Sequence, residues 1–71
     1  MNKFEEIKEY VKNELEESKR DLYNTNKKIE YIKEMDKTDL LPVYIEHKLT
    51  LKEYIKELII TLKELEIWKI V

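Results

Sequence analysis

Several residue types that proteins use for chemistry are missing from this chain or occur only once. Without cysteine there is no disulfide scaffold, no thiolate metal site and no cysteine nucleophile. Without glycine there is no loop in which backbone amides could approach a phosphate. The only serine, Ser18, has no histidine at a useful spacing, and the only histidine, His47, lacks the Glu-x-x-His spacing of a helical di-iron site. We therefore expect a protein that is not an enzyme and that holds no metal or other cofactor.

Long uncharged segments are also missing. No stretch approaches the roughly 18 apolar residues that a membrane-spanning helix needs, and the acidic N-terminal residues lack the apolar segment of a signal peptide. The net charge of −2 is nearly balanced, whereas a protein that binds nucleic acid by electrostatics is usually clearly basic. We expect a cytoplasmic protein with no membrane partner and no small-molecule substrate.

Alanine and glutamine do not occur either. An idealised designed helical protein would use alanine on its helix surfaces, so the composition favours a natural sequence. Lysine, isoleucine, asparagine and tyrosine are abundant, and their codons are rich in A and T. This composition favours an origin in a low-GC genome, its phage or its plasmid.

The chain does contain charged and apolar residues in equal measure, 42% each. This apolar content is too high for a disordered tail, and 71 residues are enough for one small domain. The single proline, Pro42, separates two long runs of helix-forming residues. We therefore expect one helical-hairpin domain over residues 1–71.

The residues before the proline predict a first helix over about residues 3–36. Asn2 and Glu5 have the spacing of a capping box at its start. Apolar or small residues then recur at steps of three and four, as the seam between two helices requires. These positions are Phe4, Val11, Ser18, Thr25 and Ile32 in one row and Leu15, Leu22 and Ile29 in the other, with Ile7 and Met35 at the flanks. Asn24-Thr25-Asn26 has modest helix propensity, so a break with Asn26 as a new N-cap is the alternative to the continuous helix that we favour.

The polar segment 36–39 predicts the turn, at about residues 37–39. Either Thr38 or Asp39 can cap the next helix, and Pro42 then falls in its first turn, where a missing N–H costs nothing. The second helix is expected over about residues 40–69. Its seam positions are Leu41, Ile55 and Leu62 in one row and Tyr44, Leu51, Leu58 and Leu65 in the other, with Ile45 and Ile59 widening the stripe.

A short turn between two long helices forces them to pack antiparallel, so the predicted fold is all-α, a coiled-coil-like two-helix hairpin. A two-helix seam leaves apolar residues of both arms in water, and the second arm carries more of them. A second copy could cover these residues by forming an antiparallel four-helix bundle as a homodimer, which is the arrangement we favour. A helix supplied by a larger host protein is the other solution.

Ser18 and Thr25 occupy seam positions where leucine or isoleucine would stabilise the fold more. The simpler interpretation is that small residues there admit Leu51, Leu58 or Tyr54 from the other arm. Each hydroxyl would then bond back to a backbone carbonyl. The alternative is that a buried polar position fixes the register or the oligomeric state. We favour the first interpretation.

Three surfaces are candidates for binding. The candidate partner-binding residues are Ile59, Ile60, Ile67 and Trp68 of the second helix and the acidic Glu5, Glu9 and Glu16 of the first. The candidate nucleic-acid-binding residues are Arg20, Tyr23, Lys27, Lys28 and Tyr31. An acidic helix can occupy a basic groove on a partner, and an apolar helix face can dock into an assembly. Arginine and tyrosine can stack on unpaired bases.

The leading hypothesis is therefore a small non-catalytic protein–protein interaction module. It could be a phage- or mobile-element-encoded regulator or inhibitor that acts through its helix surfaces. An RNA- or DNA-binding hairpin dimer, using the basic and aromatic face of the first helix, is one alternative. A structural subunit that docks its second helix into a larger assembly is another.

Overall fold

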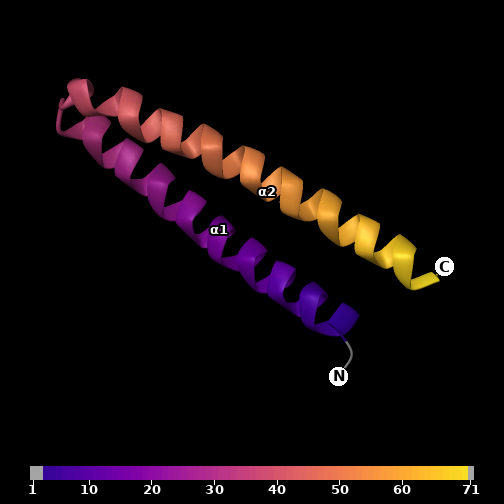
Figure 1. The fold of residues 1–71 in the computed structure, drawn as a ribbon. Coiled ribbons are helices and arrows are strands. Elements are labelled where there is room, and N and C mark those ends of the chain that lie inside the picture. The colour runs from indigo at the N-terminus through magenta and orange to yellow at the C-terminus, as the bar shows by residue number, and fades with distance from the viewer. Residues whose placement is uncertain (1–2, 71) are drawn as a thin grey trace.

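The chain folds into two long antiparallel helices joined by a tight turn (Figure 1). The computed structural model describes the backbone of residues 3–70 and the side chains of residues 3–67. Helix α1 spans Lys3–Glu34, a short 3₁₀ helix η1 spans Thr38–Leu40, and helix α2 spans Leu41–Ile70. No strand occurs in this part of the chain. The predicted all-α hairpin is therefore confirmed, while the proposed N-cap Asn2 lies outside the described residues.

Helix α1 continues without a break through residues 24–26. The hydroxyl of Thr25 donates a hydrogen bond of 2.8 Å to the backbone carbonyl of Asp21, one turn earlier. This is the type of carbonyl bond that the sequence predicted for a polar seam residue, and it satisfies the hydroxyl inside the seam. The alternative of a new helix starting at Asn26 is wrong.

Helix α1 ends at Glu34, short of the predicted boundary near residue 36, because Asp36 adopts a left-handed backbone conformation with φ of 58°. The N–H of Asp36 donates to the carbonyl of Lys33 at 3.3 Å, and the N–H of Lys37 donates to the carbonyl of Ile32 at 3.1 Å. Together these bonds form a Schellman motif, in which the left-handed residue is usually glycine. The chain has no glycine, and aspartate is one of the few residues that tolerate this conformation.

The start of α2 differs from the expectation of a capping side chain. Thr38 and Asp39 lie inside η1 and do not directly precede α2. The backbone N–H of Leu41 bonds to the carbonyl of Thr38, so the 3₁₀ turn leads into the helix through main-chain bonds. Pro42 is the second residue of α2, where its missing N–H has no intrahelical partner to lose.

The two helices pack through one narrow seam. Its buried residues are Val11, Ser18, Thr25, Ile29 and Ile32 from α1 and Leu51 and Leu58 from α2. Ser18 and Thr25 are each only 5% exposed, which fits small residues that allow the opposite leucines to approach. Tyr54 is 43% exposed and so does not fill this space. None of the described large side chains is fully enclosed.

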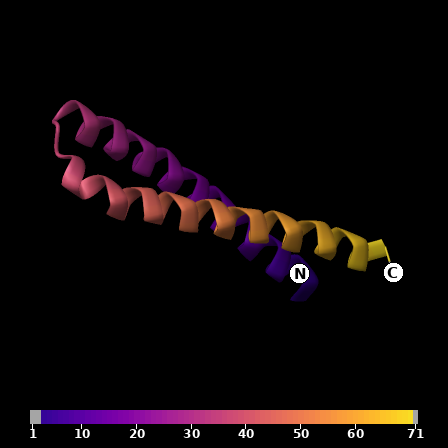
Figure 2. The same ribbon diagram turned by 90° about the horizontal axis from the view of Figure 1, so that it is seen from above.

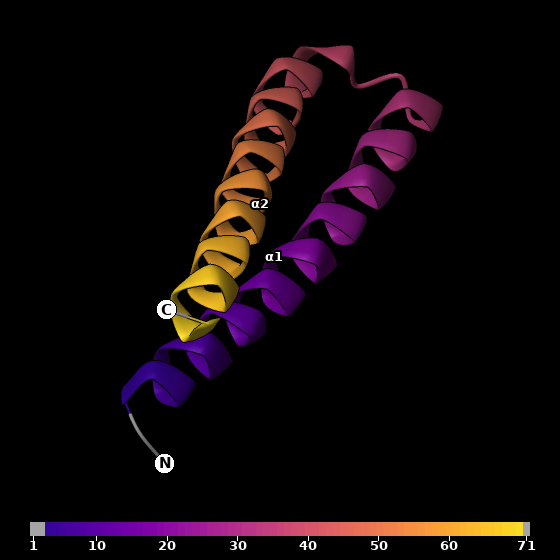
Figure 3. The ribbon, with the colours of Figure 1, turned by 90° about the vertical axis from the view of Figure 1, so that its right-hand side faces the viewer.

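The hairpin is one helix thick. Its Cα trace extends over 53 × 17 × 12 Å. The radius of gyration is 16.3 Å, against about 11 Å for a compact domain of this length. Figures 2 and 3 show no third element covering either side of the described helices. Both broad sides of the hairpin are therefore open to a partner.

Candidate interaction surfaces

Large apolar side chains remain on the outside of the hairpin. Those that are more than a third exposed are Ile7, Tyr10, Tyr23, Tyr31, Met35, Leu40, Val43, Ile45, Leu49, Tyr54, Ile59, Ile60 and Ile67. Five of them line two recesses in the surface, one along α2 and one beside the turn. In these two recesses, exposed apolar side chains gather together.

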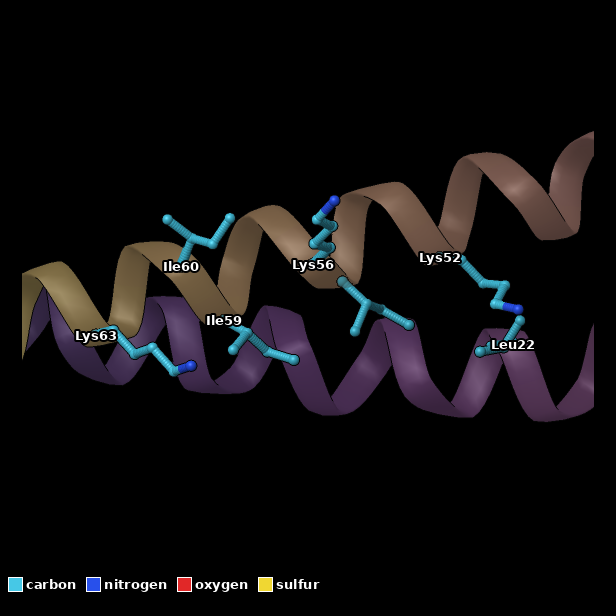
Figure 4. A pocket seen from close by; sticks show the side chains of 7 residues that line it. Leu22, Lys52, Lys56, Ile59, Ile60 and Lys63 are labelled. Carbon is cyan, nitrogen blue, oxygen red and sulfur yellow. The ribbon is translucent and has the colours of Figure 1, made fainter.

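The larger recess, here called the lysine groove, has a volume of about 450 Å³ (Figure 4). It is lined by Leu22 of α1 and by Lys52, Ile55, Lys56, Ile59, Ile60 and Lys63 of α2. In Figure 4, Lys52 ends beside Leu22, whereas Lys56 points away from α1. The lining combines an apolar floor with three ammonium groups and contains no carboxylate.

Helical spacing brings the groove residues together. Lys56 follows Lys52 by four residues and Lys63 follows Lys56 by seven, which is about one turn and two turns, so all three lie on one side of α2. Ile55 and Ile59 form an adjoining ridge with the same four-residue step. Each lysine can lay its aliphatic stem along the isoleucines while its ammonium group stays in water.

The smaller recess, here called the turn pocket, has a volume of about 260 Å³. It is lined by Lys28, Tyr31, Ile32, Met35, Lys37, Leu40 and Tyr44. These residues come from the end of α1, the turn and the start of α2, because the Schellman motif folds the chain back at Asp36. The pocket thus joins an aromatic ring from each arm with one lysine of α1 and one of the turn.

The five predicted nucleic-acid-binding residues are all exposed on α1. The ammonium group of Lys27 lies 5.4 Å from the ring centre of Tyr23, which is a cation–π contact. Arg20 lies about one turn before that pair, and Tyr31 lies about one turn after Lys27. Lys28 and Tyr31 also line the turn pocket.

The predicted acidic face follows the first half of α1. Glu9 and Glu16 are exposed and lie seven residues apart, which places them on the same side of the helix. Glu5 is half-buried, and its charge helps to raise the pKa of Lys8. Glu9 and Glu16 are thus the acidic side chains of this face that are most open to a partner.

The predicted apolar docking residues of α2 separate. Ile59 and Ile60 line the lysine groove. Ile67 is 60% exposed and lies beyond the groove lining, toward the end of α2. The side chain of Trp68 lies outside the described residues. The structure therefore places two of these four residues in a formed recess.

Two polar contacts between the arms were not predicted from the sequence. The ammonium group of Lys8 pairs with the carboxylate of Glu66 near the open end of the hairpin, and the Tyr54 hydroxyl donates to Oε2 of Glu14 at 3.1 Å. The hydrogen bond to Glu66 raises the pKa of Lys8, and the hydrogen bond to Glu14 raises the pKa of Tyr54. The sequence did offer one signal for the first contact. Lys8 precedes Leu15 by seven residues and so lies in a seam row of α1, where a lysine needs a carboxylate on the opposite arm.

Among the described residues, no three His, Cys, Asp or Glu side chains gather in a group that could hold a metal ion. His47 is exposed on α2. Over the same part of the chain, neither helix has an apolar stretch that is long enough to cross a bilayer.

No known protein family, curated protein or solved structure matches this chain. A functional proposal therefore depends on the surfaces described above.

Proposed function

We propose that this protein is a small non-catalytic interaction module that binds another protein through the outer surfaces of its helices. The observation that carries the proposal is the exposure of thirteen large apolar side chains among the described residues of a two-helix hairpin. Apolar residues scattered singly over a surface are normal. Here, however, five of the thirteen gather in two recesses, and gathered apolar surface is typical of interaction sites.

A partner helix laid on one broad side of the hairpin would add the missing layer. Helices in stable domains bury their apolar stripes against another element, and each Å² of apolar surface removed from water stabilises the contact by about 25 cal/mol. A regulator or inhibitor that binds transiently would use this contact. A structural subunit that docks α2 permanently into a larger assembly would use the same contact.

The partner can also be a second copy of this chain. Two hairpins would then form an antiparallel four-helix bundle. The exposed Ile45 and Leu49, one turn apart on α2, support this pairing, because a bundle could cover them. Sedimentation equilibrium at micromolar concentration tests it. A monomeric mass at every concentration would contradict the homodimer and leave a different protein as the partner.

Cross-linking in cells of the native host, followed by affinity capture, tests the interaction function. We expect the wild-type chain to retain a specific protein. One of three double variants should no longer retain this protein, although its circular dichroism shows the same helix content as the wild type. The variants, one for each surface, are Ile59→Ser/Ile60→Ser in the lysine groove, Glu9→Lys/Glu16→Lys on the acidic face and Tyr31→Ser/Met35→Ser in the turn pocket. Capture of no specific protein, or equal capture by all three variants, would contradict the proposal.

Nucleic acid is a second candidate partner, favoured by the exposed Tyr23 with Lys27 above its ring. A stacked base and a neighbouring phosphate could use such a pair. The runner-up proposal is therefore an RNA- or DNA-binding hairpin dimer. A gel-shift assay at low salt with Lys27→Glu/Lys28→Glu as the comparison tests this role. Absence of a shift, or a shift indifferent to those changes, would end it.

A further inference from the structure

The lysine groove is positively charged in a protein whose net charge is −2. Its positive charge therefore reflects the placement of particular side chains and not the overall composition. Ile59 and Ile60 in its lining are 37% and 40% exposed, although aliphatic side chains gain most from full burial. A basic apolar groove of this kind is incomplete without an occupant of opposite charge.

Three carboxylates of the two helices lie away from the groove. Tyr54 is adjacent to Ile55 and so is turned about 100° around α2 from it, and the bond from Tyr54 to Glu14 marks the side of the seam away from the groove. Asp21 follows Glu14 by seven residues, and Glu57 follows Tyr54 by three, so neither faces the groove lysines. Glu66 follows Ile59 by seven residues and lies on the groove side, where it pairs with Lys8. The groove lining itself therefore contains lysines and no carboxylate.

The groove has the length of a short helix. The eleven residue steps from Lys52 to Lys63 rise about 16 Å along α2, which is about three helical turns. The floor is aliphatic, so it offers no aromatic platform on which nucleic-acid bases could stack. A second copy placed face to face by two-fold symmetry would bring the lysines of both copies together, and like charges oppose such pairing.

We propose that the lysine groove is the docking site for an acidic amphipathic helix of another protein. This proposal rests on the interaction function proposed above. An apolar ridge of the incoming helix lies on Leu22, Ile55 and Ile59 and completes a three-helix layer. Carboxylates that flank this ridge pair with the three groove lysines, which fixes the orientation and excludes basic helices.

The first test uses a synthetic peptide of about 18 residues, long enough to span the groove. Its leucines are placed at helical spacing and flanked by glutamates. A comparison peptide carries lysine in place of every glutamate. We expect the acidic peptide to bind at least about tenfold more tightly than the basic one. In NMR titrations, its largest shifts should fall on Leu22, Ile55, Ile59 and Ile60.

The second test reverses the groove charges with the variant Lys52→Glu/Lys56→Glu/Lys63→Glu. We expect this variant to bind the basic peptide in preference to the acidic one. The matched control is Lys27→Glu/Lys33→Glu/Lys37→Glu, which makes the same charge change outside the groove. Because distant charges are screened, the control should keep its affinity for the acidic peptide within about threefold.

Four outcomes would overturn the docking site. The first two are equal binding of the acidic and basic peptides, and NMR shifts that fall outside the groove. The third is displacement of the acidic peptide by phosphatidylglycerol vesicles that bind through the groove lysines. The fourth is self-association of the hairpin that depends on those lysines. A fifth separates this inference from the interaction function. If a protein captured from the host is still retained by the groove charge-reversal variant, the interaction function stands and the groove is not its docking site.

Discussion

Asp36 is the residue at which the chain reverses, because its left-handed backbone ends α1. A residue with a Cβ atom adopts this conformation at a cost of about 1–2 kcal/mol, less for aspartate, whereas glycine adopts it freely. Asp36→Gly should therefore raise the free energy of unfolding by about 0.5–1 kcal/mol. Urea denaturation followed by circular dichroism measures this change.

The matched control at the same position is Asp36→Val. A β-branched residue is strongly disfavoured at positive φ, so this variant should lower the free energy of unfolding by at least about 1 kcal/mol. Similar stabilities for the glycine and valine variants would show that residue 36 is not left-handed in solution.

Tyr54 links stability to alkaline pH. Its bond to Glu14 raises the pKa of the phenol above the ordinary 10.0, so the folded state holds the proton more tightly than the unfolded state. This stabilisation is complete below about pH 10 and is lost as the pH rises through the folded pKa. Tyr54→Phe should therefore lose less stability than the wild type as the pH rises above about 10. If the wild type and Tyr54→Phe show identical slopes of unfolding free energy against pH, the hydrogen bond from Tyr54 to Glu14 is contradicted.

The Lys8 ammonium group changes stability in the same direction. Its hydrogen bond to Glu66 raises the pKa above 10.5, so its contribution is present below that pH and is lost as the pH rises further. The Tyr54→Phe variant retains this contribution. Some alkaline loss of stability should therefore remain in it.

At the scale of the helices, α2 should show a sharp contrast between neighbouring leucines. Leu51 is 9% exposed in the seam, whereas Leu49 in the same helix is 57% exposed. Leu51→Ala should lower the free energy of unfolding by about 2–3 kcal/mol, and Leu49→Ala by less than about 0.5 kcal/mol. Both substitutions replace leucine by alanine, so they change helix propensity equally and differ only in the burial of the side chain. If thermal denaturation shows the same loss of unfolding free energy for both variants, Leu51 does not lie in the seam.

Both helices and their antiparallel packing could be predicted from the apolar rows, because the period of a row identifies the buried face of a helix. The row that contains Leu22 and Ile29 keeps its phase across residues 24–26, which is why a continuous α1 was predicted correctly. The end of α1 was harder to predict. Aspartate in a polar segment does not by itself reveal a left-handed residue, and the usual glycine signal is absent.

The candidate site could be predicted only in part. Ile59 and Ile60 were identified because they extend the apolar stripe of α2 beyond its seam. The groove lysines were not, since lysines on a highly charged helix resemble ordinary solvated surface. Which α1 residue meets which α2 residue depends on the backbone of the turn. Neither the place of Leu22 in the groove nor the pairing of Lys8 with Glu66 could be read from one helix alone.

The whole molecule is elongated, and seven of its described residues are buried in the seam. Such a small core stabilises a domain only marginally. If the proposed four-helix bundle forms, pairing adds stability by mass action, so the thermal midpoint should rise with protein concentration. Circular dichroism melts across a wide concentration range measure this. A constant midpoint would contradict the homodimer.

The position of the single turn also predicts the order in which contacts between the helices form during folding. Ile32 and Tyr44 both line the turn pocket and meet by closing a short loop, whereas Lys8 and Glu66 can meet only when nearly the whole chain has closed. Loop-closure entropy grows with loop length, so folding should begin at Asp36 and proceed toward the open end. A ligand that binds at the turn should then accelerate folding, whereas one that binds at the open end should mainly slow unfolding.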